Sequence, residues 1–212
     1  MKKLLLVLAM VCLATGVFAV DVSLGFGASV GSYSNDLKGN YFGDFESNMT
    51  RTPWNFMAYA DMTYLQIEVG YRMFHGAHET DTGYPDTDLD KFSGSWVSFA
   101  AYGKIPLPLG SITFFPMVGV EYDSTLSGTF SDGTEWDSQT KSDQNEFWIK
   151  GGLGLDISVS PQVYIRPEFL VGYKLLNKPE QDQVDYLKSI GATNVSWVDL
   201  SFEGSILIGV RI

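Results

Sequence analysis

The sequence predicts an all-β protein, an eight-stranded antiparallel up-and-down transmembrane β-barrel. The first observation is that apolar and polar residues alternate along eight stretches of the chain. A period of two is typical of a β-strand whose two faces meet different surroundings. The second observation is that the connections between these stretches are alternately long and short. The third is that the apolar face carries no charge in any of the eight stretches.

The start of the chain predicts a secretory signal peptide over residues 1–19, which leaves a barrel domain over 20–212. Two lysines precede an apolar run over 4–17, and Ala19 suits a cleavage site. The run is too short and wrongly flanked for a transmembrane helix. Cleavage after Ala19 would leave a chain without cysteine, because Cys12 is the only cysteine. A secreted domain without disulfides needs another means of holding itself together, and a closed hydrogen-bonded barrel would provide it.

The composition excludes several classes of protein. A net charge of -11 makes the chain a poor candidate for binding nucleic acid. After the predicted signal peptide, no apolar run approaches the roughly 18–20 residues that a transmembrane helix needs. Yet 45% of the residues are hydrophobic and 14% are aromatic. We therefore expect strands, rather than helices, to present this apolar surface.

The predicted strands are stretches in which every second residue is apolar. Most are long enough to cross a bilayer as tilted strands, which takes about 9–11 residues. In chain order they lie near 22–31, 54–61, 64–74, 97–104, 112–122, 146–157, 165–175 and 198–212.

The composition of the polar face indicates which face meets lipid. In the strand at 64–74, Ile67 and Val69 alternate with Glu68 and Arg72. A soluble barrel would expose its polar face and fill it with Lys and Glu. Here the polar face is rich in Gly and Ser with scattered charges of both signs, which suits a narrow interior. We predict that Ile67 and Val69 face lipid and that Glu68 and Arg72 face the lumen; a soluble lipocalin-like ligand-binding barrel is the alternative.

The connections place the predicted strands in a membrane. Outer-membrane barrels have short periplasmic turns and long extracellular loops, and the predicted connections alternate in the same way. The long polar connections lie near 34–52, 75–93, 124–143 and 176–195, and the short ones near 61–63, 106–110 and 160–162.

Two prolines interrupt this pattern. Pro116 and Pro167 lie within predicted strands, and each lacks the N–H that would form a ladder hydrogen bond. Proline is usually tolerated at the free edge of a sheet, and a closed barrel has no free edge. We therefore expect a bulge or kink at each proline, with the faces inverted beyond it.

The chain resembles the small eight-stranded outer-membrane barrels of the OmpA, OmpX and OmpW kind. The resemblance rests on the signal peptide, the alternating strands, the loop asymmetry and the last strand, 198-VDLSFEGSILIGVRI-212, which departs from the pattern by ending in Ile212 rather than an aromatic residue. It implies a location in the bacterial outer membrane, contact with outer-membrane lipids, assembly by periplasmic chaperones and the barrel-assembly machinery, and a monomer. Acyltransferases, lipid deacylases and proteases are known on this architecture, but the chain resembles them in fold only.

The main candidate site is a network of charged residues inside the barrel. One interpretation is a structural ion-pair network that fills the lumen, because buried charges are tolerated when paired. The other is a narrow path or gate for ions. Eight strands leave room for side chains rather than a wide channel. The network comprises Glu68, Arg72, Glu121, Lys150, Arg166, Glu168 and Glu203.

The loops hold three further candidates. The histidines of 75-HGAHETD-81 could ligate zinc with the nearby acids, and 86-DTDLD-90 resembles the opening of a calcium loop. Stretches of these two kinds are more often solvated loops than metal sites, so we expect no metal and no cofactor. The stretch 178–191 predicts a short helix that begins at Pro179 and packs an apolar stripe on the barrel rim.

These observations favour a non-enzymatic protein. No histidine lies in a strand beside a serine or carboxylate, so a catalytic triad has little support. The expected role is a structural or surface-exposed barrel with a largely filled polar lumen. A narrow channel for small solutes, ions or apolar compounds is the alternative from the transport class.

Overall fold

The computed structural model describes residues 21–41, 44–81, 88–175 and 177–212. The predicted signal peptide lies outside the described residues. So does Asp86 of the candidate calcium loop, and the side chains of Asp88 and Asp90 are not described either.

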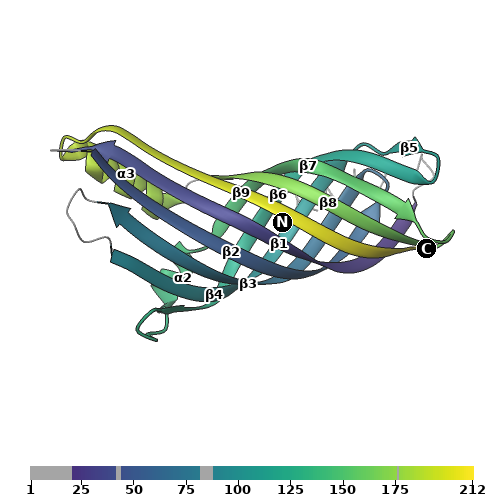
Figure 1. Ribbon diagram of the computed structural model, residues 1–212, viewed down its shortest axis with the longest axis horizontal. Coiled ribbons are helices and arrows are strands. Elements are labelled where there is room, and N and C mark those ends of the chain that lie inside the picture. Colours follow the sequence, from purple (N-terminus) through teal and green to yellow (C-terminus); the bar gives the residue numbers. More distant parts are fainter. Residues whose placement is uncertain (1–20, 42–43, 82–87, 176) are drawn as a thin grey trace, which may run out of the picture.

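Eight long strands form a closed ring (Figure 1). Each pairs antiparallel with its neighbours in the sequence, and the first strand pairs with the last. A short strand, β5 (Leu107–Leu109), adds to the edge of β6. The predicted eight-stranded antiparallel barrel is therefore confirmed. The eight are β1 (Val22–Asn40), β2 (Asp44–Met62), β3 (Leu65–Asp81), β4 (Asp88–Lys104), β6 (Ile112–Phe130), β7 (Glu146–Ser158), β8 (Val163–Leu175) and β9 (Thr193–Arg211).

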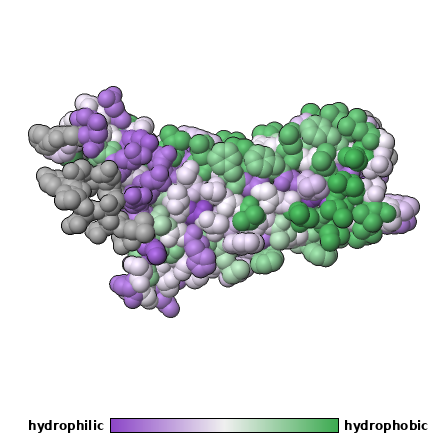
Figure 2. Space-filling view, in the orientation of Figure 1, coloured by the Kyte–Doolittle hydropathy of each residue, from purple (hydrophilic) through white to green (hydrophobic). Residues whose placement is uncertain are grey.

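The apolar face of the ring points outward. On β3, Ile67 and Val69 are 45% and 47% exposed, whereas Glu68 and Arg72 are buried. Figure 2 shows the same polarity over one side of the molecule, where a hydrophobic belt covers the part away from the helices and hydrophilic residues gather at the other end. A soluble barrel would have the opposite arrangement, so the exterior of the belt is the lipid-facing surface.

The strands continue well beyond the hydrophobic belt. On β1, alternate outward residues are apolar as far as Val30 and are followed by Ser32, Ser34, Asp36 and Lys38 on the same face. The strand ends that the alternation predicted are therefore wrong, because much of 34–52 and 75–93 is paired strand. Outside the bilayer the outward face of a strand meets water instead of lipid and carries polar residues, so the alternation that marks a strand disappears there.

Short and long connections lie at opposite ends of the barrel (Figure 1). The turn end carries the tight connections, including Thr63 and Tyr64 between β2 and β3 and Gly110 at φ +70° between β5 and β6. The loop end carries the strand extensions and both helices, α2 (Ser138–Asp143) and α3 (Lys178–Ser189). The predicted asymmetry holds for the connections after β6 and β8, whereas only residues 41–43 join β1 to β2, because most of 34–52 belongs to the two strands.

The helix predicted over 178–191 forms as α3. Asn177 caps it, and Asn177 and Glu180 exchange the two hydrogen bonds of a capping box. Gly191, at φ +98°, follows its end. Of the apolar stripe, Val184 is buried but Ile190 is 37% exposed, so the stripe packs only in part. Neither helix of the described residues has the length and apolar character to cross a membrane.

The expected bulges at the prolines are wrong. The β6 ladder passes Pro116 and the β8 ladder passes Pro167 without a change of register. The carbonyl of Pro116 accepts a hydrogen bond from the backbone N–H of Ile105 (3.1 Å). The N–H that Pro116 lacks would point to the same edge of β6 as this carbonyl. Pro116 therefore falls in the gap between the part of β6 that pairs with β4 and the part that pairs with β5. Pro167 coincides with a short interruption of the β7–β8 ladder, which resumes in the same register. Each missing donor therefore coincides with a gap in the ladder and leaves the register unchanged.

The side chains inside the barrel leave little room for a larger residue, and a substitution at Ser201 on β9 tests this. Ser201 is 1% exposed. We expect Ser201→Phe to lower the free energy of unfolding by about 1–3 kcal/mol, because overpacking a filled interior forces side chains and backbone to shift. Denaturant titration of the detergent-folded protein measures this. Ser196→Phe, at an exposed position of the same strand, is the control, and equal stability of the two variants would contradict a filled lumen at Ser201.

Candidate functional site

Charged side chains near the turn end are gathered around Arg166 of β8. Its guanidinium donates to Asp61, to Asp156 (Nε to Oδ1, 2.5 Å) and to the Gln66 carbonyl oxygen (2.6 Å). Lys104 Nζ also contacts Asp61 (2.6 Å). The Arg166 side chain is fully buried. We call Arg166, Asp61, Asp156, Lys104 and Gln66 the Arg166 cluster; it ties β2, β3, β4, β7 and β8 together across the lumen.

Two buried carboxylates meet at the amide of Gln66. Gln66 Nε2 donates to Glu68 Oε1 (2.5 Å) and to Glu168 Oε1 (2.9 Å), and Ser205 Oγ donates to Glu168 Oε2 (3.3 Å). Among the residues that the structure describes, neither Glu68 nor Glu168 forms an ion pair with a basic side chain. Neutral donors therefore stabilise this pair.

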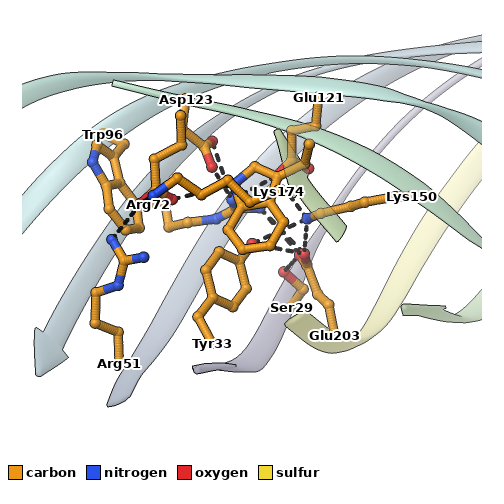
Figure 3. Close-up of polar contacts among 12 residues, drawn as sticks. Ser29, Tyr33, Arg51, Arg72, Trp96, Glu121, Asp123, Lys150, Lys174 and Glu203 are labelled. Atoms are coloured by element: carbon orange, nitrogen blue, oxygen red, sulfur yellow. Dashed lines mark hydrogen bonds and ion pairs between the residues drawn. The ribbon is translucent and has the colours of Figure 1, made fainter. Parts of the chain in front are cut away.

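The middle of the lumen holds a second ion-pair cluster (Figure 3). Arg72 of β3 contacts Glu121 (2.7 Å), Asp123 (2.9 Å) and Glu203 (3.3 Å). Lys150 of β7 contacts Glu121 (2.6 Å) and Glu203 (2.8 Å). All five side chains are at most 5% exposed. We call them the Arg72 cluster; two cations face three carboxylates, with every charge in contact with an opposite one.

Hydroxyl groups complete this cluster. Lys150 Nζ donates to Tyr33 Oη (3.0 Å), and Ser29 Oγ donates to Glu203. The rings nearby also contact the cations, since the Arg72 guanidinium lies 5.4 Å from the Tyr33 ring centroid. The surrounding hydrogen bonds are what a buried ion pair needs to offset its desolvation.

A third set of ion pairs lies toward the loop end. Arg51 of β2 contacts Glu146 (2.7 Å), and Lys174 of β8 contacts Glu146 (3.2 Å), Asp199 (3.1 Å) and Glu180 (2.6 Å). Because Glu180 belongs to α3, this set fixes the helix to the inner wall of the barrel. The capping box of α3 and the ion pair share the same carboxylate.

Aromatic rings fill the lumen around these charges. Tyr33, Phe74, Trp96 and Trp148 are at most 1% exposed. Phe74 and Trp96 are stacked with centroids 4.0 Å apart, and Tyr33 and Trp148 are 4.9 Å apart. Trp136, from the connection between β6 and α2, joins the same group at 6.1 Å from Phe74. Aromatic and charged side chains are thus in direct contact with one another in the interior.

The structure brings the seven candidate lumen residues into two groups. Arg72, Glu121, Lys150 and Glu203 form one cluster, while Arg166, Glu68 and Glu168 meet through Gln66.

Other members of these groups do not follow from the alternation in the sequence. Arg51 lay in a stretch expected to be a loop, and Asp123 followed the expected end of its strand at 122. Tyr33 and Trp96 were missed because both lie at the ends of predicted strands. Tyr33 could have been found by counting every second residue of the first strand beyond the apolar belt, because the inward positions continue in the same alternation.

The loop candidates do not assemble a metal site within the described residues. His78 contacts Ser47 (2.8 Å), and no group of three or more His, Cys, Asp or Glu side chains in the described part of the chain could hold a metal ion. The acidic side chains of the 86–90 candidate lie outside the described side chains.

The rim at the loop end carries carboxylates with strong local donors. The backbone N–H of Thr140 donates to Asp137 (2.7 Å) at the start of α2 and holds the pKa of that carboxyl below its ordinary value. The backbone N–H of Thr134 does the same for the pKa of Asp132 (2.8 Å). Both groups are therefore charged at neutral pH and keep this rim acidic.

No protein-family model matches the chain, and no curated protein matches it. Several solved structures are similar to it. The outer membrane protein OprG from Pseudomonas aeruginosa is 16% identical, with 92% of this chain and 96% of OprG covered and a TM-score of 0.46. Neisserial surface protein A is 13% identical, with 87% and 97% covered and a TM-score of 0.43. The outer membrane protease OmpT from Escherichia coli is 5% identical, with 93% and 100% covered and a TM-score of 0.38.

The identity of the fold rests on the geometry of the chain itself. Only helices and closed barrels satisfy every backbone hydrogen bond within a bilayer. This ring is closed by the pairing of β1 with β9, it points its apolar residues outward and it buries its charges. The chain is an eight-stranded transmembrane β-barrel protein.

Proposed function

We propose that this protein is a structural, surface-exposed barrel whose lumen is closed, and that it has no catalytic role. The observation that carries the proposal is the Arg72 cluster, in which Arg72, Lys150, Glu121, Asp123 and Glu203 meet across the middle of the lumen. An ion that passed this level would have to separate buried, mutually paired charges, which costs far more than the ion gains.

The aromatic rings support the same proposal. Tyr33 and Trp148 lie beside the Arg72 cluster with no exposed surface, and Phe115 and Tyr102 are equally buried toward the turn end. An eight-stranded barrel is just wide enough for side chains to fill. The strand extensions and helices at the loop end then carry whatever contacts the protein makes outside the cell.

The proposal includes the surroundings of the barrel. Outer-membrane lipids cover the hydrophobic belt, periplasmic chaperones and the barrel-assembly machinery insert the chain, and the barrel acts as a monomer. The acidic charge of the chain argues against a nucleic-acid partner.

A narrow cation path is the second candidate, and one observation favours it. Glu68 and Glu168 are buried, and neither has a basic partner among the described side chains. Such a pair would attract a cation if the rest of the lumen opened.

Conductance in a planar bilayer separates the two candidates. We expect the refolded protein to give no discrete current steps, because the ion pairs and rings close the lumen. Insertion is verified by heat-modifiable migration of the recovered protein, and a large porin added to the same bilayer shows that steps can be detected. Reproducible steps that change in size in Lys150→Gln would overturn the closed lumen, and cation selectivity lost in Glu68→Gln would favour the second candidate.

A further inference from the structure

The loop end of the barrel contains a pocket of about 550 Å³. Inward residues of the strand extensions, the connection that holds Trp136, the end of α2 and the start of α3 line it. Its volume falls within the roughly 300–1,000 Å³ of small-molecule sites. The pocket lies on the loop-end side of the Arg72 cluster and shares Lys174 and Glu180 with the third set of ion pairs, so it is distinct from the middle of the lumen.

Aromatic rings form much of the wall. The Trp136 ring lies 6.3 Å from Phe92 and 6.0 Å from Phe130, centroid to centroid, and Trp197 of β9 also lines the pocket. Such rings provide flat apolar surfaces on which a ring-shaped ligand can stack.

Two side chains of the lining leave a hydrogen-bond donor without a partner. Asn35 Nδ2 and Trp136 Nε1 are buried, and no acceptor lies within reach of either among the residues that the structure describes. Each residue is 5% exposed. A buried indole N–H usually has a partner, and leaving a donor unpaired is costly. The missing partners are acceptors, since both groups only donate.

The charges of the lining are largely used within the protein. Lys174 is paired with Glu180, Glu146 and Asp199, and Asp132 and Asp143 accept from Thr134 and Gln139. The pocket therefore offers no unpaired buried charge to a charged ligand, which favours a neutral one.

We propose that this pocket binds a neutral saccharide. A C–H face of a pyranose ring can stack on Trp197, and its ring and hydroxyl oxygens can accept from Asn35 Nδ2 and Trp136 Nε1 once a small shift of these two side chains opens their donors to the pocket. Its hydroxyl protons can be donated to the carboxylates of the lining. The ligand is a free oligosaccharide or the sugar of a glycolipid, because the chemistry of recognition is the same. The proposal is independent of whether the lumen conducts.

Calorimetric titration of the full, folded protein tests the proposal. The protein is kept in lauryldimethylamine oxide, because detergents with sugar headgroups would compete. The probes are maltotriose, cellotriose and triacetylchitotriose, and a parallel arm uses a neutral glycosyl diacylglycerol dispersed in the same detergent. We expect at least one probe to bind. Binding of the glycosyl diacylglycerol alone would assign the site to a glycolipid, and binding of a free trisaccharide would assign it to soluble sugars.

Matched variants locate the binding. Trp136→Phe keeps the ring and removes the unpaired donor, and we expect it to weaken binding roughly five- to tenfold. Trp197→Phe is the control, because Trp197 Nε1 already donates to Asp199 Oδ1 (3.0 Å), and we expect a change of less than about twofold. Asn35→Leu removes the second donor and decides the matter if Trp136→Phe does not fold, as judged by heat-modifiable migration.

Three results would overturn the proposal. The first is that neither the saccharides nor the glycosyl diacylglycerol binds. The second is that binding is unchanged in the folded donor variants. The third is that menadione, a ring-bearing carbonyl compound without hydroxyl groups, binds as tightly and with the same dependence on Trp136.

Discussion

Replacing Arg72 with methionine should lower the free energy of unfolding by about 3–5 kcal/mol, the range for a buried ion pair that loses one partner. Arg72 is the only basic side chain among the described residues that contacts Asp123, whose side chain is fully buried. It also contacts Glu121 and Glu203, which would keep only Lys150 as a cation. The methionine side chain fills most of the volume of the arginine, so the loss of stability comes from the carboxylates that remain without a cation rather than from a cavity.

Guanidinium titration in lipid vesicles, followed by tryptophan fluorescence, measures the loss. Adding Asp123→Asn to Arg72→Met should restore part of the stability, because it removes the carboxylate left without a partner. Lys38→Met is the surface control, since Lys38 and Glu46 are both about half exposed, and we expect no measurable change from it. A loss in Arg72→Met as small as that of the control would show that the Arg72 cluster is not buried.

Placing an arginine at Ile67 should cost about 1–3 kcal/mol, because Ile67 is lipid-facing and lies between the turn-end edge of the belt and the bilayer midplane, where the cost is about 2–4 kcal/mol. Ile67 is 45% exposed on the outward face of β3, with Val69 beside it on the same face. An exposed isoleucine on a water-facing surface would accept arginine with little loss. The large effect follows only if the surface meets hydrocarbon.

Thr50→Arg is the matched control for the lipid-facing variant. Thr50 is exposed on the outward face of β2, in the strand extension beyond the hydrophobic belt. We expect its arginine variant to unfold like the parent protein in vesicles. Equal losses at Thr50 and Ile67 would show that the position of the belt is wrong.

The sequence predicted the membrane-spanning part of the fold well because lipid and lumen impose different residues on the two faces of each strand. Leu65, Ile67 and Val69 could be separated from Glu68 and Arg72 without any knowledge of neighbouring strands. The same signal disappears above the belt, which is why Arg51 and Asn35 were placed in a loop although both lie on paired strands with buried side chains. The prediction of a bulge at each proline was wrong for a related reason, because the sequence does not show where the hydrogen-bond ladder between two strands has a gap.

The candidate site was predictable as a set of residues but not as an arrangement. Parity along one strand shows that Glu68 and Arg72 point inward, and the same local reasoning applies to Lys150 and Glu203. It does not show that Arg72 meets Glu203, which is far along the chain on β9. That contact depends on the stagger of the strands when the ring closes.

The sequence by itself determined the number of strands, the lipid-facing residues and the end of the barrel that carries the long connections. These properties follow from a local period of two and from the bilayer as solvent. Only the tertiary structure decided which charges pair, how α3 is tied to the wall through Glu180 and Lys174, and where Trp136 closes the outer pocket. Each of these joins residues from strands or loops distant in the chain, and closure of the ring sets their positions.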